Sequence, residues 1–326
     1  MGSDMLPPFG FTTVFTRWQF APIVTAFVVV FAALYLWGVI RVRRQHPKRP
    51  WPLWRTCMFL AGLLVVVMAT ESGIGAYDDI LFWDHMIQHL MLIMVAPPLL
   101  VTGQPVTLLL HASRNPLHTR VKKLLRSRVI TAITFPAVGV VAYAVTIVGT
   151  HLTSFMNLVM QNDAVHSAEH ALYLIVGYLY FLPLVGREPL HWKLSYPVRL
   201  FLLFIAMPVD AFTGVVLGMS TTVPWSSMAT QARPSWAPNA LDDVHIGGGV
   251  MWVGGAAIMF VVIMLVFLAW SKDTRASSRF GWLENARRAN IGELVNAPVD
   301  RGDVDDDEHL DAYNAYLARL NSPDKH

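Results

Sequence analysis

Two pairs of histidines are spaced four residues apart in otherwise apolar stretches of the chain. His85 and His89 lie in the segment WDHMIQHLMLIMVAPPLL, and His166 and His170 lie in HSAEH, with Glu169 between them. Residues i and i+4 of an α-helix lie one turn apart on the same face, so each pair can present two imidazoles to one point. Imidazole is a common ligand of copper, zinc, iron and haem. The spacing therefore predicts a metal or haem site built by two helices.

The composition of the chain indicates a membrane protein. Of its 326 residues, 54% are hydrophobic and 14% are charged, whereas about a quarter of the residues in an average soluble domain are charged. Apolar runs of roughly 20 residues are candidate transmembrane helices. Seven such runs cover residues 20–40, 54–70, 84–102, 130–150, 167–185, 199–219 and 246–270. The predicted fold is an all-α, polytopic bundle of seven transmembrane helices.

Basic residues are divided unequally between the loops. Fifteen Lys and Arg residues follow the first, third and fifth runs, whereas the alternate loops and the N-terminal segment contain only Arg17 and Arg233. Because cytoplasmic loops carry the excess of basic residues, we expect the N-terminus outside and the C-terminus in the cytoplasm. Both histidine pairs then lie at the outer ends of their helices. The basic loops are expected to contact the headgroups of the lipid bilayer and no nucleic acid.

Three parts are predicted along the chain. Residues 1–19 form an external N-terminal segment, residues 20–270 form the membrane domain, and residues 271–326 form a cytoplasmic tail. The tail contains an acidic run of Asp303, Asp305, Asp306, Asp307 and Glu308. Acidic, weakly hydrophobic segments remain solvated, so the tail is expected to be largely disordered.

Further polar residues are predicted to lie near the histidine pairs. His245 begins the seventh run on the outer side, so we expect it to be a fifth ligand in the same pocket. Glu169 and Asp242 are expected to orient the ligating imidazoles. Asp210 lies within the sixth run beside Pro208, where an ionisable group indicates either a functional role or a hydrogen bond to backbone freed by the proline.

The remaining residues of the outer layer have simpler interpretations. His151 ends the fourth run as a lone histidine and is interpreted as a hydrogen-bonding surface residue. The methionines of this layer, among them Met86, Met94 and Met251, are interpreted mainly as packing residues. The glycines at 247–249 predict a close approach of the seventh helix to a neighbour.

The residues alone leave the identity of the metal open. Cys57 is the single cysteine and falls near the inner end of the second run, which excludes thiolate ligands and structural disulfides on the outer side. Imidazole with thioether suits copper, whereas imidazole with carboxylate suits zinc or iron.

Three segments resemble the seven-span, CtaG-type cytochrome c oxidase assembly proteins of bacteria. They are DHMIQHLMLIMVAPPLLVTGQPVTLLL, HSAEHALYLIVGYLYFLPLVGREP and LDDVHIGGGVMWVGG, and the resemblance covers roughly residues 20–270. By motif match, the residues carried over are His85, His89, His166, His170, Asp242 and Asp243. Members of the family often have a different polar residue at the position of His245.

The resemblance implies a role in the assembly of a haem-copper oxidase and no enzymatic activity. The protein would bind copper in the bacterial plasma membrane and deliver it to the binuclear centre of the oxidase. Its expected partners are an oxidase subunit and a protein that donates copper.

Two other classes of function would use the same residues. In a zinc-dependent intramembrane lipid hydrolase, Asp210 or Glu169 would help a metal-bound water attack an amide. In a haem-binding electron carrier, histidines from two helices would be the axial ligands. Elemental analysis and the visible spectrum of the purified protein distinguish the three hypotheses.

Overall fold

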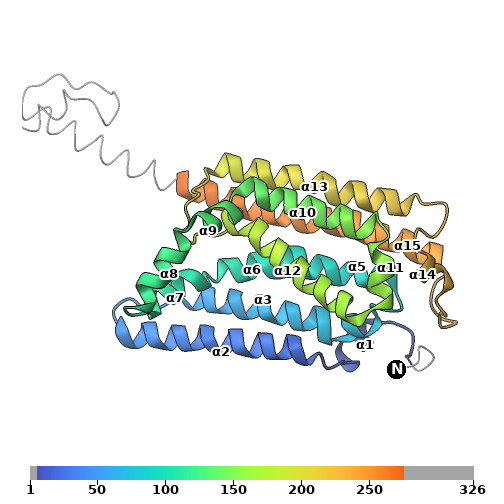
Figure 1. Cartoon of the computed structure of the whole chain (residues 1–326), viewed down its shortest axis with the longest axis horizontal. Coiled ribbons are helices and arrows are strands. Elements are labelled where there is room, and N and C mark those ends of the chain that lie inside the picture. The colour runs from blue at the N-terminus through green and yellow to red at the C-terminus, as the bar shows by residue number, and fades with distance from the viewer. Residues whose placement is uncertain (1–5, 275–326) are drawn as a thin grey trace, which may run out of the picture. The chain divides into compact units, whose positions relative to one another are not determined.

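The computed structural model describes residues 6–274, which form helices joined by loops (Figure 1). Its candidate membrane spans are Pro22–Gln45, Leu53–Tyr77, Phe82–Ala112, Tyr196–Gly218 and Ala240–Thr274. A sixth is formed if α10 (Pro136–His151) and α11 (Phe155–Gln161), which meet at 69°, count as one broken span. The chain is therefore a multi-pass membrane protein, and its described part is all-helical.

Six of the seven predicted apolar runs correspond to these candidate spans. The remaining run, 167–185, corresponds to α12 (Asp163–Leu184), a helix of 22 residues that is not among the candidate spans. The first two turns of α12 contain Asp163, His166, Glu169 and His170, which lower its hydropathy. The count of seven spans and their orientation stay predictions.

Eight helices of residues 6–274 lie along the bundle in Figure 1. They are α2 (Pro22–Gln45), α3 (Leu53–Glu71), α5 (Phe82–Leu90), α6 (Ala96–Thr102), α10, α12, α13 (Tyr196–Gly218) and α15 (Ala240–Gly249). Near one end of the bundle lie α1 (Phe11–Thr16), α11 and α14 (Ser226–Thr230), and near the other lie α7 (Pro105–Ala112), α8 (Leu117–Leu125) and α9 (Arg128–Ile133). The basic helix α8 is thus at the opposite end of the bundle from α11 and α14.

Two π-helical turns interrupt otherwise continuous helices. Met91–Val95 (η2) joins α5 to α6, and Val250–Gly254 (η3) follows α15. A proline inside an α-helix lacks one donor and clashes with the carbonyl four residues earlier. The π turn η2 ends at Val95, and Pro97 and Pro98 follow in the first turn of α6. The helical run therefore continues through both prolines.

Glycines allow two of the closest helix contacts. A Cβ atom on Gly248 would lie 2.6 Å from the carbonyl oxygen of Gly214, and one on Gly177 would lie 2.3 Å from that of Ile93. No side chain fits at these distances. The predicted close approach of the last helix is confirmed at residues 247 and 248, whereas a Cβ on Gly249 would meet open space.

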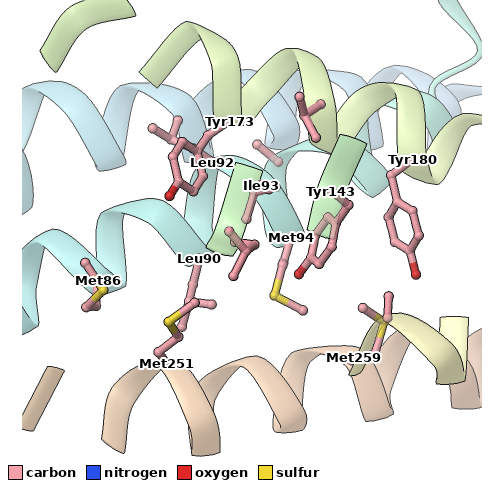
Figure 2. Packing of buried hydrophobic residues seen from close by; sticks show 14 of the residues in the cluster. Met86, Leu90, Leu92, Ile93, Met94, Tyr143, Tyr173, Tyr180, Met251 and Met259 are labelled. Carbon is pink, nitrogen blue, oxygen red and sulfur yellow. The ribbon is translucent and has the colours of Figure 1, made fainter. Parts of the chain in front are cut away.

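Methionines and tyrosines fill the core beside the π turns. Met86, Met94 and Met251 are almost completely buried and belong to one hydrophobic cluster. In Figure 2, Met251 lies opposite Leu90 and Met259 projects toward Tyr180. The interpretation of Met86, Met94 and Met251 as packing residues is confirmed by this burial.

The chain divides into one compact unit that ends at Val266 and a second that begins at Phe267. The described part of the second unit, residues 267–274, is helical. In the first unit, the N-terminal segment is held by Tyr77 and Trp236, whose side chains donate hydrogen bonds to the carbonyl oxygens of Pro7 and Leu6. The predicted tail began at residue 271, but residues 271–274 are helical. The rest of the predicted tail, residues 275–326, lies outside the described residues.

Candidate metal centre

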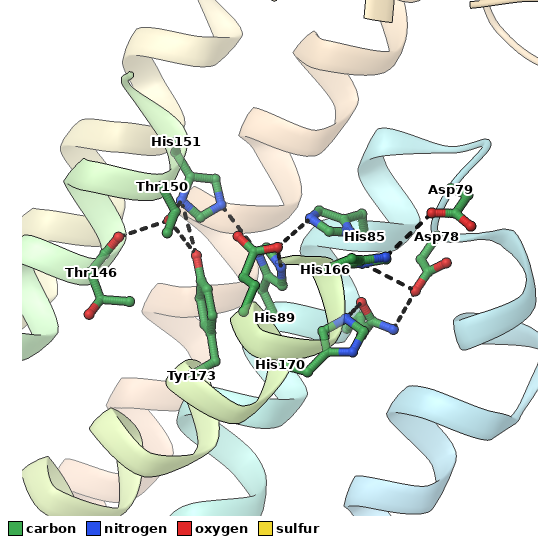
Figure 3. A network of polar contacts seen from close by, with 12 residues as sticks. Asp78, Asp79, His85, His89, Thr146, Thr150, His151, His166, His170 and Tyr173 are labelled. Carbon is green, nitrogen blue, oxygen red and sulfur yellow. Dashed lines mark hydrogen bonds and ion pairs between the residues drawn. The ribbon is translucent and has the colours of Figure 1, made fainter. Parts of the chain in front are cut away.

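The two histidine pairs meet where α5 and α12 begin. The ring centroids are 4.0 Å apart in the His85 and His89 pair and 4.4 Å apart in the His166 and His170 pair. Between the helices, the rings of His85 and His166 are 5.1 Å apart. Figure 3 shows these side chains gathered between the two helices. The spacing of four residues therefore places both pairs in a single polar cluster.

Glu169 forms the most buried group of this cluster together with His85 and His89. Its Oε2 atom lies 3.5 Å from Nε2 of His89 and 3.7 Å from Nε2 of His85. One potential ligand atom from each residue lies within 4.8 Å of the other two. We call these three residues the buried triad.

Four polar atoms of the buried triad lack hydrogen bonds among the described residues. Both carboxylate oxygens of Glu169 and the Nε2 atoms of His85 and His89 are inaccessible to solvent, and none has a hydrogen-bond partner within residues 6–274. Burying a polar group without a partner is costly. A cation held between these atoms would satisfy all of them, so the donor set fits a metal ion.

The hydrogen bonds around His89 leave its Nε2 atom free to bind a metal. Nδ1 of His151 lies 2.9 Å from the carbonyl oxygen of Ile147, which only accepts, so Nδ1 of a neutral His151 is the donor. Nε2 of His151 then accepts from Nδ1 of His89 at 3.3 Å. Nε2 of a neutral His89 consequently carries a lone pair. Such outer hydrogen bonds orient ligating imidazoles in metal sites.

Tyr173 supports the same arrangement from α12. Its ring stacks on His89 with centroids 4.1 Å apart. Its hydroxyl lies 2.6 Å from Oγ1 of Thr150, which itself donates to the carbonyl oxygen of Thr146. The orientation of the His89 ring is therefore determined by packing as well as by hydrogen bonding.

A second possible ligand group lies on the solvent side of the first. Asp78, His85 and His166 have potential ligand atoms within 4.8 Å of one another, and we call them the rim triad. Nε2 of His166 lies 3.7 Å from Oδ2 of Asp78, and its Nδ1 lies 3.4 Å from Oδ1 of Asp79. Burial raises the pKa of Asp78 to about 7. The hydrogen bond from His166 holds the pKa of Asp79 below its usual range.

His170 contacts the cluster through Gln88. Nε2 of His170 lies 2.7 Å from Oε1 of Gln88, whose Nε2 donates to Oδ2 of Asp78 at 2.6 Å. An amide oxygen only accepts, so Nε2 of His170 carries the proton in this arrangement. His170 therefore positions Asp78 and is in neither triad.

Three other residues predicted to belong to the site are in neither triad. Nε2 of His245 lies 2.8 Å from the carbonyl oxygen of Ser220. Asp242 is exposed and accepts from the side chain of Asn239. Asp210 is buried among the helices, where Tyr143 donates to its Oδ2 at 2.6 Å. No hydrogen bond, ion pair or ring contact in the described part of the chain joins them to the triads.

Asp243, the neighbour of Asp242, holds the start of α5 in place. Its carboxylate accepts from the backbone N–H groups of Phe82 and Trp83 and from Arg233 at 2.7 Å. These bonds satisfy N–H groups at the beginning of α5 that have no partner within the helix. Asp243 thereby positions the turn from which His85 and His89 project.

Several residues that contact the histidine cluster were not predicted to belong to the site. His151, interpreted as a surface residue, is 2% exposed and contacts His89. Gln88 follows His85 by three residues and therefore lies on the same helix face. This spacing is the one feature of the local sequence that places Gln88 near the histidines. Asp78 and Asp79 were not among the residues predicted for the site.

A cavity of about 200 Å³ opens onto the rim triad. Its lining includes Asp78, His85 and His166, together with the acidic residues Asp79 and Asp163. Met156, Met160 and Met228 also line it. The cavity therefore combines carboxylates with thioethers beside the imidazoles.

The match to a known protein family agrees with this arrangement. Residues 33–273 match the family described as cytochrome c oxidase caa3 assembly factor (Caa3_CtaG). The chain belongs to this family. The match includes both triads and α15, and it is to a family of assembly factors, not to a family of enzymes.

Similar curated proteins come from mycobacteria. An uncharacterized protein of Mycobacterium bovis and one of Mycobacterium tuberculosis are each 30% identical to the chain over 98% of its length. One of Mycobacterium leprae is 28% identical. The chain spans about half, 47%, of the length of these relatives. No solved structure matches the chain.

Proposed function

We propose that this protein binds a copper ion at the outer side of the bacterial plasma membrane and delivers it to a cytochrome c oxidase during assembly. The observation that carries the proposal is the convergence of His85, His89 and Glu169, whose buried Nε2 and carboxylate oxygen atoms have no hydrogen-bond partner among the described residues. A bound cation would remove that cost. Membership of a family of oxidase assembly factors supports a cytochrome c oxidase as the recipient.

Several features favour copper over the alternatives. The thioethers that line the cavity suit copper, whereas the carboxylate in each triad also suits zinc or iron, so elemental analysis of the purified protein decides between these metals. The cavity of about 200 Å³ is smaller than the roughly 300 Å³ at the lower end for drug-sized ligands, which argues for an ion and against haem. A hydrolase that used Asp210 would need that carboxylate beside the metal, whereas Asp210 bonds Tyr143 instead.

The predicted orientation follows from the two ends of the bundle. The helix α8, which contains Lys122 and Lys123, lies at the end opposite to α11 and α14. Basic loops are retained in the cytoplasm, so the end with α11 and α14 would face outward. A copper donor protein would approach there, and the acceptor subunit of the oxidase would dock on the same side.

Each residue of the site would have a distinct task. Nε2 atoms of His85 and His89 would bind the ion, and Glu169 would offset its charge in a medium of low dielectric constant. His151 and Tyr173 would keep the ring of His89 in the binding orientation. Release to the oxidase would require another set of ligands to replace these residues.

Asparagine substitutions of single histidines test the proposal. His89→Asn should lower the copper content of the purified protein, and the copper content and activity of the oxidase in the same membranes. His245→Asn is the matched control because it removes an imidazole outside both triads. Both variants should insert at the level of the wild type.

Two results would count against copper delivery. A deletion strain with a fully metallated, fully active oxidase under copper limitation would remove the proposed function. The hydrolase would be favoured by two findings together. The purified protein would contain zinc, and Asp210→Asn would change the lipid composition of the membrane but not its oxidase content.

A further inference from the structure

The rim triad and the buried triad share one residue, His85. Asp78 and His166 complete the rim triad, whereas His89 and Glu169 complete the buried triad. A site for a single stationary ion would need only one of the two groups. Because the two triads share His85, they form two neighbouring positions for one ion, and the imidazole of His85 can bind the ion in both positions.

The two positions differ in their access to solvent. The side chains of the buried triad are at most 4% exposed, whereas His166 in the rim triad is 12% exposed and the adjacent Asp79 is 72% exposed. The cavity of about 200 Å³ contacts Asp78, His85 and His166 but neither His89 nor Glu169. An ion that enters through this cavity therefore meets the rim triad first.

The lining of the cavity suits the capture of a copper ion. Asp79 and Asp163 add carboxylates that attract cations, and the thioethers of Met156, Met160 and Met228 are weak ligands suited to Cu(I). Arg233 also lines the cavity, but its charge is offset by Asp243 at 2.7 Å. The balance of charge at the entrance is therefore negative.

We propose that the protein passes its copper ion from the rim triad to the buried triad while His85 stays bound. The inference rests on the proposed function. Asp78 and His166 would be exchanged for His89 and Glu169 one at a time, so the ion would never lose all its ligands in surroundings where a bare charge is very costly. The step is ligand exchange alone, with no change in the oxidation state of copper.

Rapid loading of the full-length protein with Cu(I) tests this inference. Detergent-purified protein would be mixed with Cu(I) buffered by a chromophoric chelator, and both the loading rate and the equilibrium affinity would be measured. Asp78→Asn should slow loading about tenfold or more and change the equilibrium affinity less than about threefold. Glu169→Gln should lower the equilibrium affinity about 100-fold because it changes the final position.

Asp242→Asn is the matched control for the loading rate. Asp242 is an exposed carboxylate that neither lines the cavity nor belongs to a triad, so its replacement should change the rate less than about threefold. Size-exclusion chromatography and thermal unfolding of each variant would verify that it is folded. A variant that failed this check would be replaced by His166→Asn, for which the same slowed loading is expected.

The outcomes separate the inference from the proposed function. If Asp78→Asn and Glu169→Gln weaken equilibrium binding equally, the two triads form one site and the inference is wrong. If Asp78→Asn changes neither rate nor affinity, the inference is also wrong, while copper binding by the buried triad stands. If the wild type binds no copper, both the inference and the proposed function fail.

Discussion

Asp243 and Glu169 are both buried carboxylates that face α5, but their surroundings differ. Asp243 accepts hydrogen bonds from two backbone N–H groups and from Arg233. Glu169 accepts none among the described residues and has only imidazoles within ion-pair distance. The first carboxylate has the partners of a structural group, and the second has the surroundings of a ligand.

This difference shows that burial alone does not identify a functional acid. A buried carboxylate with complete hydrogen bonding stabilises the elements that it joins, whereas one without partners costs free energy unless another charge is bound. The same distinction applies to the histidines. Nε2 of His245 meets a carbonyl oxygen, whereas Nε2 of His89 has no hydrogen-bond partner within residues 6–274.

Asp243→Ala should have the largest effect on folding. It removes the carboxylate that pairs with Arg233 and leaves two N–H groups of α5 without an acceptor, and removing one member of a buried ion pair costs roughly 3–5 kcal/mol. Unfolding in mixed micelles, followed by far-UV circular dichroism, measures this loss. If the free energy of unfolding falls by less than about 1 kcal/mol, the Asp243 and Arg233 pair behaves as an exposed ion pair. Asp243 would then not be the structural carboxylate that we describe.

Glu169→Gln should act on copper binding and spare the fold. We expect the affinity for Cu(I) to fall by at least about 100-fold, or roughly 2.8 kcal/mol. The metal-free variant should be as stable as the wild type or more stable, because the change removes a buried charge without partners. Chelator competition gives the affinity, and the same unfolding measurement gives the stability. Destabilisation as large as that of Asp243→Ala would identify Glu169 as structural.

Tyr143→Phe extends the comparison to Asp210. The hydroxyl of Tyr143 is the donor to Oδ2 of Asp210, and Oδ1 of Asp210 has no partner among the described residues. Losing that donor should destabilise the protein by about 1–3 kcal/mol without changing the affinity for copper. Tyr180→Phe is the control, since Tyr180 donates to a backbone carbonyl oxygen at 3.2 Å. Weaker copper binding in Tyr143→Phe would connect Asp210 to the metal site.

His245→Asn should have the smallest effect on copper binding. Because His245 bonds the carbonyl oxygen of Ser220 and belongs to neither triad, its replacement should change the affinity less than about threefold, or ~0.7 kcal/mol. Isothermal titration or chelator competition measures this change. A loss comparable to that of Glu169→Gln would place His245 among the ligands.

The sequence by itself determined the helical membrane class and the two histidine pairs. Hydropathy and the spacing of four residues are local properties, since a helix places residues i and i+4 on one face whatever packs against it. The assignment of His85, His89, His166 and Glu169 to one cluster followed from these properties and from the resemblance to assembly proteins. Family membership was correctly predicted for the same reason, because its motifs are short and contiguous.

Only the tertiary structure decided which polar residues share the site. Asp242 and Asp243 are adjacent in sequence, but successive residues are rotated by about 100° around a helix, so one is exposed and the other caps α5. His151 and His245 were both lone histidines at helix ends. The first lies against His89 and the second against Ser220, because the rotation and neighbours of each helix are determined by long-range packing, which local sequence does not specify.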